Sequence, residues 1–260
     1  MLNFSKKVIV SLSVVTALAL SCSADTQPIS DKQELAKQDS FLNAYANIAY
    51  DVYNDTLKDA QALKDAIDKF AKKPTQENLN NAKKAWLNAR ESYGQSEAFR
   101  LSKGPVDAEE GWVSEAYGSL EGQINPWPLD ENMIDYTIDA NGKRTSGNII
   151  DTIGKFNPGG EESKEVDVTK ITVEAITDLN ENGGKANVAT GYHAIEFLLW
   201  GQDQDYSNFL KDKVTKGPMT AGQRNLKDFT SDKNAARRLA YLTASAEKLV
   251  ADLELIASAW

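Results

Sequence analysis

The stretch TGYHAIEFLLWGQD, residues 190–203, contains the only histidine of the chain, and a glutamate follows it three residues later. Residues three apart lie on one face of a helix, so His193 and Glu196 can either bind one cation together or bind each other. Catalytic zinc usually takes three protein ligands, commonly two histidines and a carboxylate, as in H-E-x-x-H or H-x-x-E-H. Phe197 follows Glu196, and with a single histidine neither pattern is completed. One imidazole with carboxylates favours a harder or borderline cation such as iron or calcium.

A second pair of charged residues continues an apolar stripe. Trp86, Ala89 and Tyr93 recur at helical spacing, and Glu97 and Arg100 follow on the same line. Burying either charge alone is costly, so both residues need partners. The pair therefore indicates either a structural ion pair or a helix that ends at a polar cavity.

Other common kinds of catalytic site are not supported by the sequence. The only cysteine, Cys22, stands near the N-terminus, and no serine motif stands near His193. No glycine-rich loop has the pattern of a phosphate-binding loop. The formal net charge is −9, or −11 without Lys6 and Lys7, and such an acidic chain argues against nucleic acid as a partner.

The first residues have the features of a secretory signal. Two lysines precede an apolar run that is too short for a stable membrane span. Cys22 follows small residues in the manner of a bacterial lipobox, although leucine is usual where Ala19 stands. We predict a signal peptide over 1–22 with lipid on Cys22, or else a simple cleaved signal, and then a polar tether over 23–36. On this prediction the protein is exported to the cell envelope and contacts the membrane through its lipid anchor only.

Long amphipathic helices are expected to position the charged pairs. Apolar residues at helical spacing predict a helix over 41–70, which ends before Pro74. Thr75 can cap the next helix, which carries the stripe that leads to the second charged pair. A third long helix is predicted to start near Ser231 or Asp232, with spacings of three and four that suit bundle packing.

The histidine helix is predicted to be short, because it has signals for both ends. Thr190 can cap its start, and Gly201 can end it after about three turns. On this helix His193, Glu196 and Trp200 share one face, so the two polar side chains stand on an otherwise apolar element.

The region over 102–188 is less regular and rich in proline and glycine. It predicts short helices at 129–138 and 169–179, joined by ordered loops, with flexible stretches at 157–165 and 180–184. No alternating strand pattern of any length is present. The sequence therefore predicts an all-α, helical-bundle protein.

Four stretches of the chain resemble the imelysin family, whose members are also called imelysin-like peptidases or iron-regulated periplasmic proteins. They are, in family order, ESYGQSEAFRLSKGPVD at 91–107, LEGQINPWPLDENMIDY at 120–136, GYHAIEFLLWGQD at 191–203 with a G-x-H-x-x-E signature, and QRNLKDFTSDKNAARRLAYL at 223–242. The resemblance implies an all-α fold of two helical bundles, with the signature histidine and glutamate near a cleft between them. It also implies a link to bacterial iron uptake and carries a peptidase label.

The resemblance transfers the family motifs to particular positions. The residues on which the two clearest motifs fall are Gly191, His193, Glu196, Glu97 and Arg100. The last two are the pair that the apolar stripe had already placed on a core-facing line. Asp130 and Asp135, in the stretch PLDENMIDY, are weaker candidates that can simply cap a short helix.

The resemblance also suggests how the chain is divided. We expect an N-terminal helical bundle with long ordered loops over 37–185 and the start of a C-terminal bundle over 186–260. Family members are usually longer, and the apolar stripe of the last helix runs to Trp260 without a cap. The second bundle is therefore expected to be incomplete in this chain.

Three functions follow as hypotheses. The first is a cell-envelope lipoprotein of bacterial iron uptake, facing the periplasm or the cell surface and working with other envelope iron-uptake proteins. Its cargo is iron, another divalent metal or a metal-bearing ligand, with His193, Glu196 and Glu97 as metal ligands. The second is a metallopeptidase that uses His193 and Glu196. The third is a non-catalytic binding module with a structural polar network of four residues, His193, Glu196, Glu97 and Arg100.

Overall fold

The computed structural model describes residues 31–139, 141–203 and 224–260. The chain separates into one unit over Met1–Ala46 and a second unit over Asn47–Trp260. The described part of the first unit is helical throughout. Cys22, the predicted signal and most of the predicted tether lie outside the described residues. No described helix has the length and apolar character needed to cross a membrane.

The first two helices of the described residues form a hairpin, which has the predicted helix end and the predicted cap. Helix α2 (Asp31–Lys72) begins earlier than expected, so residues 31–36 of the predicted tether are helical. It ends just before Pro74, as predicted, because proline cannot continue a helix. The Thr75 hydroxyl then accepts a hydrogen bond of 3.2 Å from the Asn78 N–H, which caps α3 (Gln76–Gln95). A 3₁₀ turn, η1 (Ser96–Phe99), follows directly.

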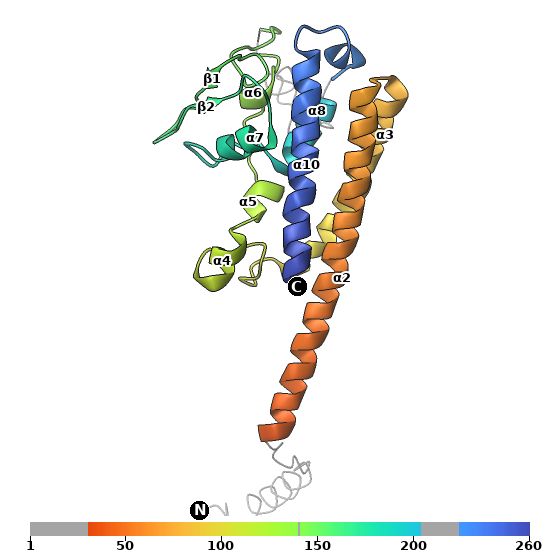
Figure 1. Cartoon of the computed structure of the whole chain (residues 1–260), viewed down its shortest axis with the longest axis vertical. Helices are drawn as coiled ribbons and strands as arrows, with labels where there is room; N and C mark the ends of the chain where they lie inside the picture. Colours follow the sequence, from red (N-terminus) through yellow and green to blue (C-terminus); the bar gives the residue numbers. More distant parts are fainter. Residues whose placement is uncertain (1–30, 140, 204–223) are drawn as a thin grey trace, which may run out of the picture. The chain divides into compact units, whose positions relative to one another are not determined.

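Three helices far apart in the sequence, α3, α8 (Gly191–Trp200) and α10 (Ala235–Ala259), pack together in the second unit, and buried residues of α2 such as Leu63 and Phe70 complete its core (Figure 1). Helix α8 packs against both α3 and the last helix, α10. The last helix begins a few residues later than predicted, because the 3₁₀ turn η2 (Leu226–Phe229) and a further turn precede it. The all-α prediction is confirmed.

The irregular region folds along one side of α10 as short elements (Figure 1). They are α4 (Gly111–Tyr117), α5 (Glu121–Ile124), α6 (Glu131–Ile134), α7 (Val173–Leu179) and the strands β1 (Lys155–Phe156) and β2 (Val166–Asp167). Helices α6 and α7 lie within the predicted helices 129–138 and 169–179. The two strands pair antiparallel and were not predicted, since two residues are too few to show an alternating pattern.

The two stretches predicted to be flexible bind each other. Residues 157–165 connect β1 to β2, and residues 180–184 follow α7. The Asn182 side chain accepts a hydrogen bond from the Lys164 N–H and donates one to the Lys164 carbonyl, each 2.8 Å long. These two bonds connect the loop between β1 and β2 to the segment after α7.

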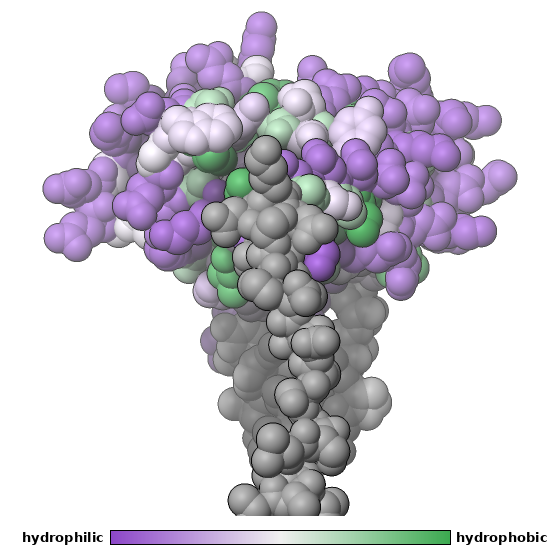
Figure 2. Space-filling view, turned by 90° about the horizontal axis from the view of Figure 1, so that it is seen from below, coloured by the Kyte–Doolittle hydropathy of each residue, from purple (hydrophilic) through white to green (hydrophobic). Residues whose placement is uncertain are grey.

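The packing crosses the domain boundary predicted at 185/186. Helix α8 contacts α3, α5 and α6, and α10 contacts α5 and α7, so elements from both sides of that boundary share one core. The division into two bundles stays a prediction. On the surface, Figure 2 shows hydrophilic residues around the margin of one face, as expected for a chain with 38 acidic and 29 basic side chains.

Candidate functional site

Helix α8 is buried on nearly every side, and this fixes where its polar residues point. Its buried residues are Gly191, Tyr192, Ala194, Ile195, Phe197, Leu198 and Leu199. Two long-range bonds hold its start: the Trp86 indole donates to the Tyr192 carbonyl at 2.9 Å, and the Tyr241 hydroxyl donates to the Ala189 carbonyl at 2.8 Å. The partly exposed positions of the helix are His193, Glu196 and Trp200, so the predicted polar face is the accessible one.

The two predicted ends of this helix have different outcomes. Gly201 ends α8 with φ of 90°, a conformation that glycine adopts without strain, as predicted. Thr190 occupies the N-cap position, but its hydroxyl does not cap the helix. It donates instead to the Gln123 carbonyl at 2.9 Å. The prediction that the Thr190 side chain caps the helix was therefore wrong, because a local rule cannot anticipate a partner such as Gln123 in α5, 67 residues earlier in the sequence.

His193 and Glu196 contact each other directly. The imidazole Nδ1 lies 3.0 Å from Glu196 Oε2, with 19% of the histidine side chain and 42% of the glutamate side chain exposed. The indole of Trp127 covers the imidazole, with 4.8 Å between the ring centroids, and is itself 61% exposed. Of the two arrangements that the sequence left open, the structure has Glu196 as the hydrogen-bond partner of His193.

Two further carboxylates, those of Glu131 and Asp203, interact electrostatically with this pair. Glu131, at the start of α6, accepts a hydrogen bond of 2.8 Å from the Asp203 N–H, just after α8. Burial raises the pKa of Glu131 to about 7, and the negative charges of Asp203 and Glu196 act in the same direction. Burial and the charge of Glu196 also raise the pKa of Asp203, whereas His193 lowers it. Ionisation of these two carboxyl groups is therefore disfavoured, although the positive charge of Arg224 partly offsets this at Glu131, and a bound cation or proton would be favoured beside them.

This charge predicts a pH-dependent effect of Glu131→Gln. The folded protein keeps the Glu131 proton up to about pH 7, whereas the unfolded chain releases it near 4.5. Wild-type stability thus falls as pH rises between these values, and the neutral amide avoids that loss. We expect equal free energies of unfolding at pH 4 and a variant more stable by about 1–2 kcal/mol at pH 8, discounted for partial exposure.

Urea denaturation at both pH values would measure this difference. Glu97→Gln is the matched control, because the Glu97 side chain is mostly exposed and the same substitution there should give no pH-dependent gain. A Glu131→Gln variant that is no more stable than the wild type at pH 8 would contradict the electrostatic description of the site.

The donor types fit a cation, although the described residues do not enclose one. One imidazole and several carboxylates suit iron and other borderline or hard cations. Within residues 31–139, 141–203 and 224–260, no three histidine, cysteine, aspartate or glutamate side chains are grouped so that they could hold a metal ion. The predicted ligand set of His193, Glu196 and Glu97 is therefore not brought together.

Glu97 and Arg100 belong to a different cluster. Arg100 binds Glu121 Oε1 through Nη1 at 2.5 Å, and the Tyr93 hydroxyl donates to Glu121 Oε2 at 2.5 Å. Glu97 lies 3.7 Å from Arg100 with 59% of its side chain exposed. In the described part of the chain, no hydrogen bond or ion pair joins these residues to His193. The stripe placed Arg100 toward the interior, where its main partner is Glu121 in α5. It was wrong for Glu97, because α3 ends before Glu97, which is exposed in η1.

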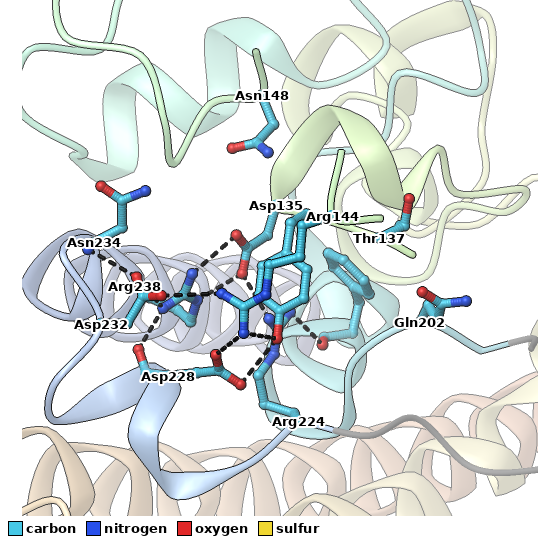
Figure 3. Close-up of polar contacts among 12 residues, drawn as sticks. Asp135, Thr137, Arg144, Asn148, Gln202, Arg224, Asp228, Asp232, Asn234 and Arg238 are labelled. Carbon is cyan, nitrogen blue, oxygen red and sulfur yellow. Dashed lines mark hydrogen bonds and ion pairs between the residues drawn. The ribbon is translucent and has the colours of Figure 1, made fainter. Parts of the chain in front are cut away.

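Asp135 lies at the centre of a buried ionic network, drawn in Figure 3. Its carboxylate binds Arg238 through two bonds of 2.6 and 3.1 Å and Arg224 through one contact of 2.9 Å. All three side chains are at most 2% exposed. Asp135 thus joins the end of α6 to α10 and to the segment before η2, and its contacts are structural.

The network extends outward through an aromatic ring. Three guanidinium groups surround Tyr136: those of Arg144, Arg224 and Arg238, at 3.8 to 5.7 Å from the ring centroid. The Tyr136 hydroxyl donates to Asp228 Oδ2 at 3.0 Å, and Arg144 binds Asp228 Oδ1 at 3.1 Å. Two of the quoted sequence stretches, 120–136 and 223–242, therefore meet in one network.

Asp130 caps a short helix, which is the role that the sequence analysis allowed for it. Its carboxylate accepts a hydrogen bond of 3.1 Å from the Asn132 N–H and so caps α6. The residues that sequence reasoning did not single out are Glu121, Trp127, Glu131, Asp203, Arg224 and Arg238. All of them lie inside the four quoted stretches, and Glu131 lies next to Asp130. The four stretches thus contained these residues, but sequence spacing alone could not show which of them contact one another.

The chain belongs to the imelysin family. The family model described as Imelysin, whose name includes a peptidase label, matches residues 49–260. No protein with a curated description matches the chain. A crystal structure of a Parabacteroides distasonis protein, named provisionally as an iron-regulated protein A precursor, is 24% identical, with a TM-score of 0.44. The match covers 80% of this chain and 40% of that one, so this chain spans less than half of that protein's length.

Proposed function

We propose that this imelysin-family protein acts in bacterial iron uptake and binds iron, or another divalent metal, as part of a metal-bearing ligand at His193. The observation that carries the proposal is a lone imidazole at the accessible face of a buried helix, with Glu196 at one ring nitrogen. Bound iron would supply Lewis acidity and positive charge at this face. His193 would hold it, while Glu131 and Asp203 would balance its charge.

The electrostatics support a positively charged cargo. Glu131 and Asp203 both bind protons more tightly than ordinary carboxyl groups, because burial and neighbouring negative charges disfavour their ionised forms. A cation placed beside them would relieve that repulsion. A metal that arrives with its own ligands needs few protein donors, so a single histidine with nearby carboxylates is sufficient for this mode of binding.

The place of action is part of the same proposal. Its support is the N-terminal sequence, in which lysines, a short apolar run and small residues lead to Cys22. We place the protein in the cell envelope, anchored by lipid on Cys22 and exposed to the periplasm or the cell surface. Other envelope iron-uptake proteins would deliver or receive the metal.

The metallopeptidase hypothesis has weaker support. Its basis is the family's peptidase label, whereas catalytic zinc usually takes three protein ligands. A peptidase mechanism would need the Glu196 carboxylate as a base or a metal ligand. In the structure this carboxylate is hydrogen-bonded to His193 Nδ1. We therefore favour binding over catalysis.

Calorimetric titration of the purified protein with ferric citrate and with Co²⁺ tests the proposal. We expect saturable binding by the wild type and its loss in His193→Ala, because the imidazole is the central donor. Glu97→Gln is the control: this residue was a ligand in the sequence hypothesis, but it lies beside Arg100, so binding should be unchanged. Equal, negligible heats for wild type and His193→Ala would sink the proposal.

A further inference from the structure

The contact between His193 and Glu196 determines which ring nitrogen carries the hydrogen. The distance from Nδ1 to Glu196 Oε2 is 3.0 Å, which is a hydrogen bond. An ionised carboxylate can only accept such a bond, so Nδ1 has to be the donor. In the neutral imidazole the other nitrogen, Nε2, then has a lone pair and no hydrogen.

The second ring nitrogen is accessible. No described residue forms a hydrogen bond with His193 Nε2. Nε2 is also absent from the buried side-chain atoms of the described residues that lack a partner, so it is not buried. The side chain is 19% exposed, so solvent reaches part of the ring. Trp127 lies against the ring, tilted by 55°, and limits how far the ring can turn. The imidazole therefore has one engaged nitrogen and one open nitrogen.

We propose that Glu196 is a positioning residue that acts through His193 and is not itself a ligand of the cargo. By accepting the Nδ1–H bond it selects the tautomer whose Nε2 lone pair is free to bind a metal. A carboxylate that accepts a hydrogen bond from one ring nitrogen of a histidine also makes the other ring nitrogen, which binds the metal, more basic. The glutamate of the G-x-H-x-x-E signature thus orients the histidine, and the metal-binding part of this inference rests on the proposed function.

The single histidine makes the tautomer directly measurable. A two-bond ¹H–¹⁵N correlation spectrum of the uniformly ¹⁵N-labelled full chain contains one imidazole, so no assignment is needed. For the neutral imidazole we expect the Nδ1–H tautomer in the wild type. Glu196→Gln should keep it, because the amide oxygen can still accept, whereas Glu196→Ala should shift toward the Nε2–H form that free histidine prefers in water. A wild type in the Nε2–H form would overturn the proposal.

Metal affinity separates a positioning residue from a ligand. With Co²⁺ as the probe, Glu196→Ala should weaken binding on the order of 10–100-fold, as for loss of an outer-shell partner. Glu196→Gln should retain most of the affinity, since it preserves the tautomer. Equal losses in both variants would overturn the positioning role and assign Glu196 as a ligand. If the wild type binds no Co²⁺ or ferric citrate, the proposed function fails, and the tautomer spectrum still decides whether Glu196 orients His193.

Discussion

Replacing Asp135 with asparagine is expected to destabilise the protein by roughly 3–5 kcal/mol, the usual cost of removing one partner from a buried ion pair. Asp135 is the shared counter-charge of Arg224 and Arg238, and all three side chains are almost completely buried. Asparagine keeps the size of the side chain but removes the negative charge, so both guanidinium groups lose their closest counter-charge. Urea denaturation followed by circular dichroism would measure the loss.

Asp130 gives the matched control for this prediction. It lies five residues earlier in the same quoted stretch and was an equally weak candidate from sequence. Because it caps α6 from an exposed position, Asp130→Ala should cost only about 1 kcal/mol. Losses of similar size for Asp130→Ala and Asp135→Asn would show that the Asp135 network contributes no more than a helix cap. If Asp135→Asn does not fold, Arg238→Met tests the same network with a side chain that can pack.

The long helices were predictable because their periodicity is local. The stripes of α2, α3 and α10 repeat over many turns, and Thr75 and Gly201 mark ends by rules that involve only neighbouring residues. Arg238 shows where this reasoning stops. It lies on the buried face of α10, yet a search for apolar spacing passes over it. Its burial depends on Asp135, 103 residues away, which no local pattern can show.

The same distinction applies to the candidate site. His193 and Glu196 were paired correctly because an i,i+3 contact is set by helix geometry. Their companions were not, because Trp127 and Glu131 come from a region of short elements without a repeating pattern. Arg100 was expected to need a partner, and Glu121 supplies it from 21 residues later. Sequence thus showed that charges had to be paired, but only the fold could say with which residues.

Gly191→Ala is expected to destabilise the protein by about 2–4 kcal/mol and to displace His193. Gly191 begins α8 with φ of +83°, a conformation that costs an alanine on the order of 1–2 kcal/mol. A Cβ at this position would also lie 2.4 Å from the Ile124 carbonyl oxygen, so the backbone of α5 or α8 would have to move. The glycine of the signature is thus required by the close approach of two helices, two residues before the histidine.

Gly94→Ala is the control, because Gly94 lies in α3 with an ordinary φ, and a methyl group added there would meet no atom within 4 Å. Alanine is the better helix former, so this variant should gain about 0.5–1 kcal/mol. Denaturation curves give both stabilities, and the single imidazole signal reports whether Gly191→Ala also changes the His193–Glu196 contact. A Gly191→Ala variant as stable as Gly94→Ala, with an unchanged imidazole spectrum, would show that α8 can approach α5 without a glycine.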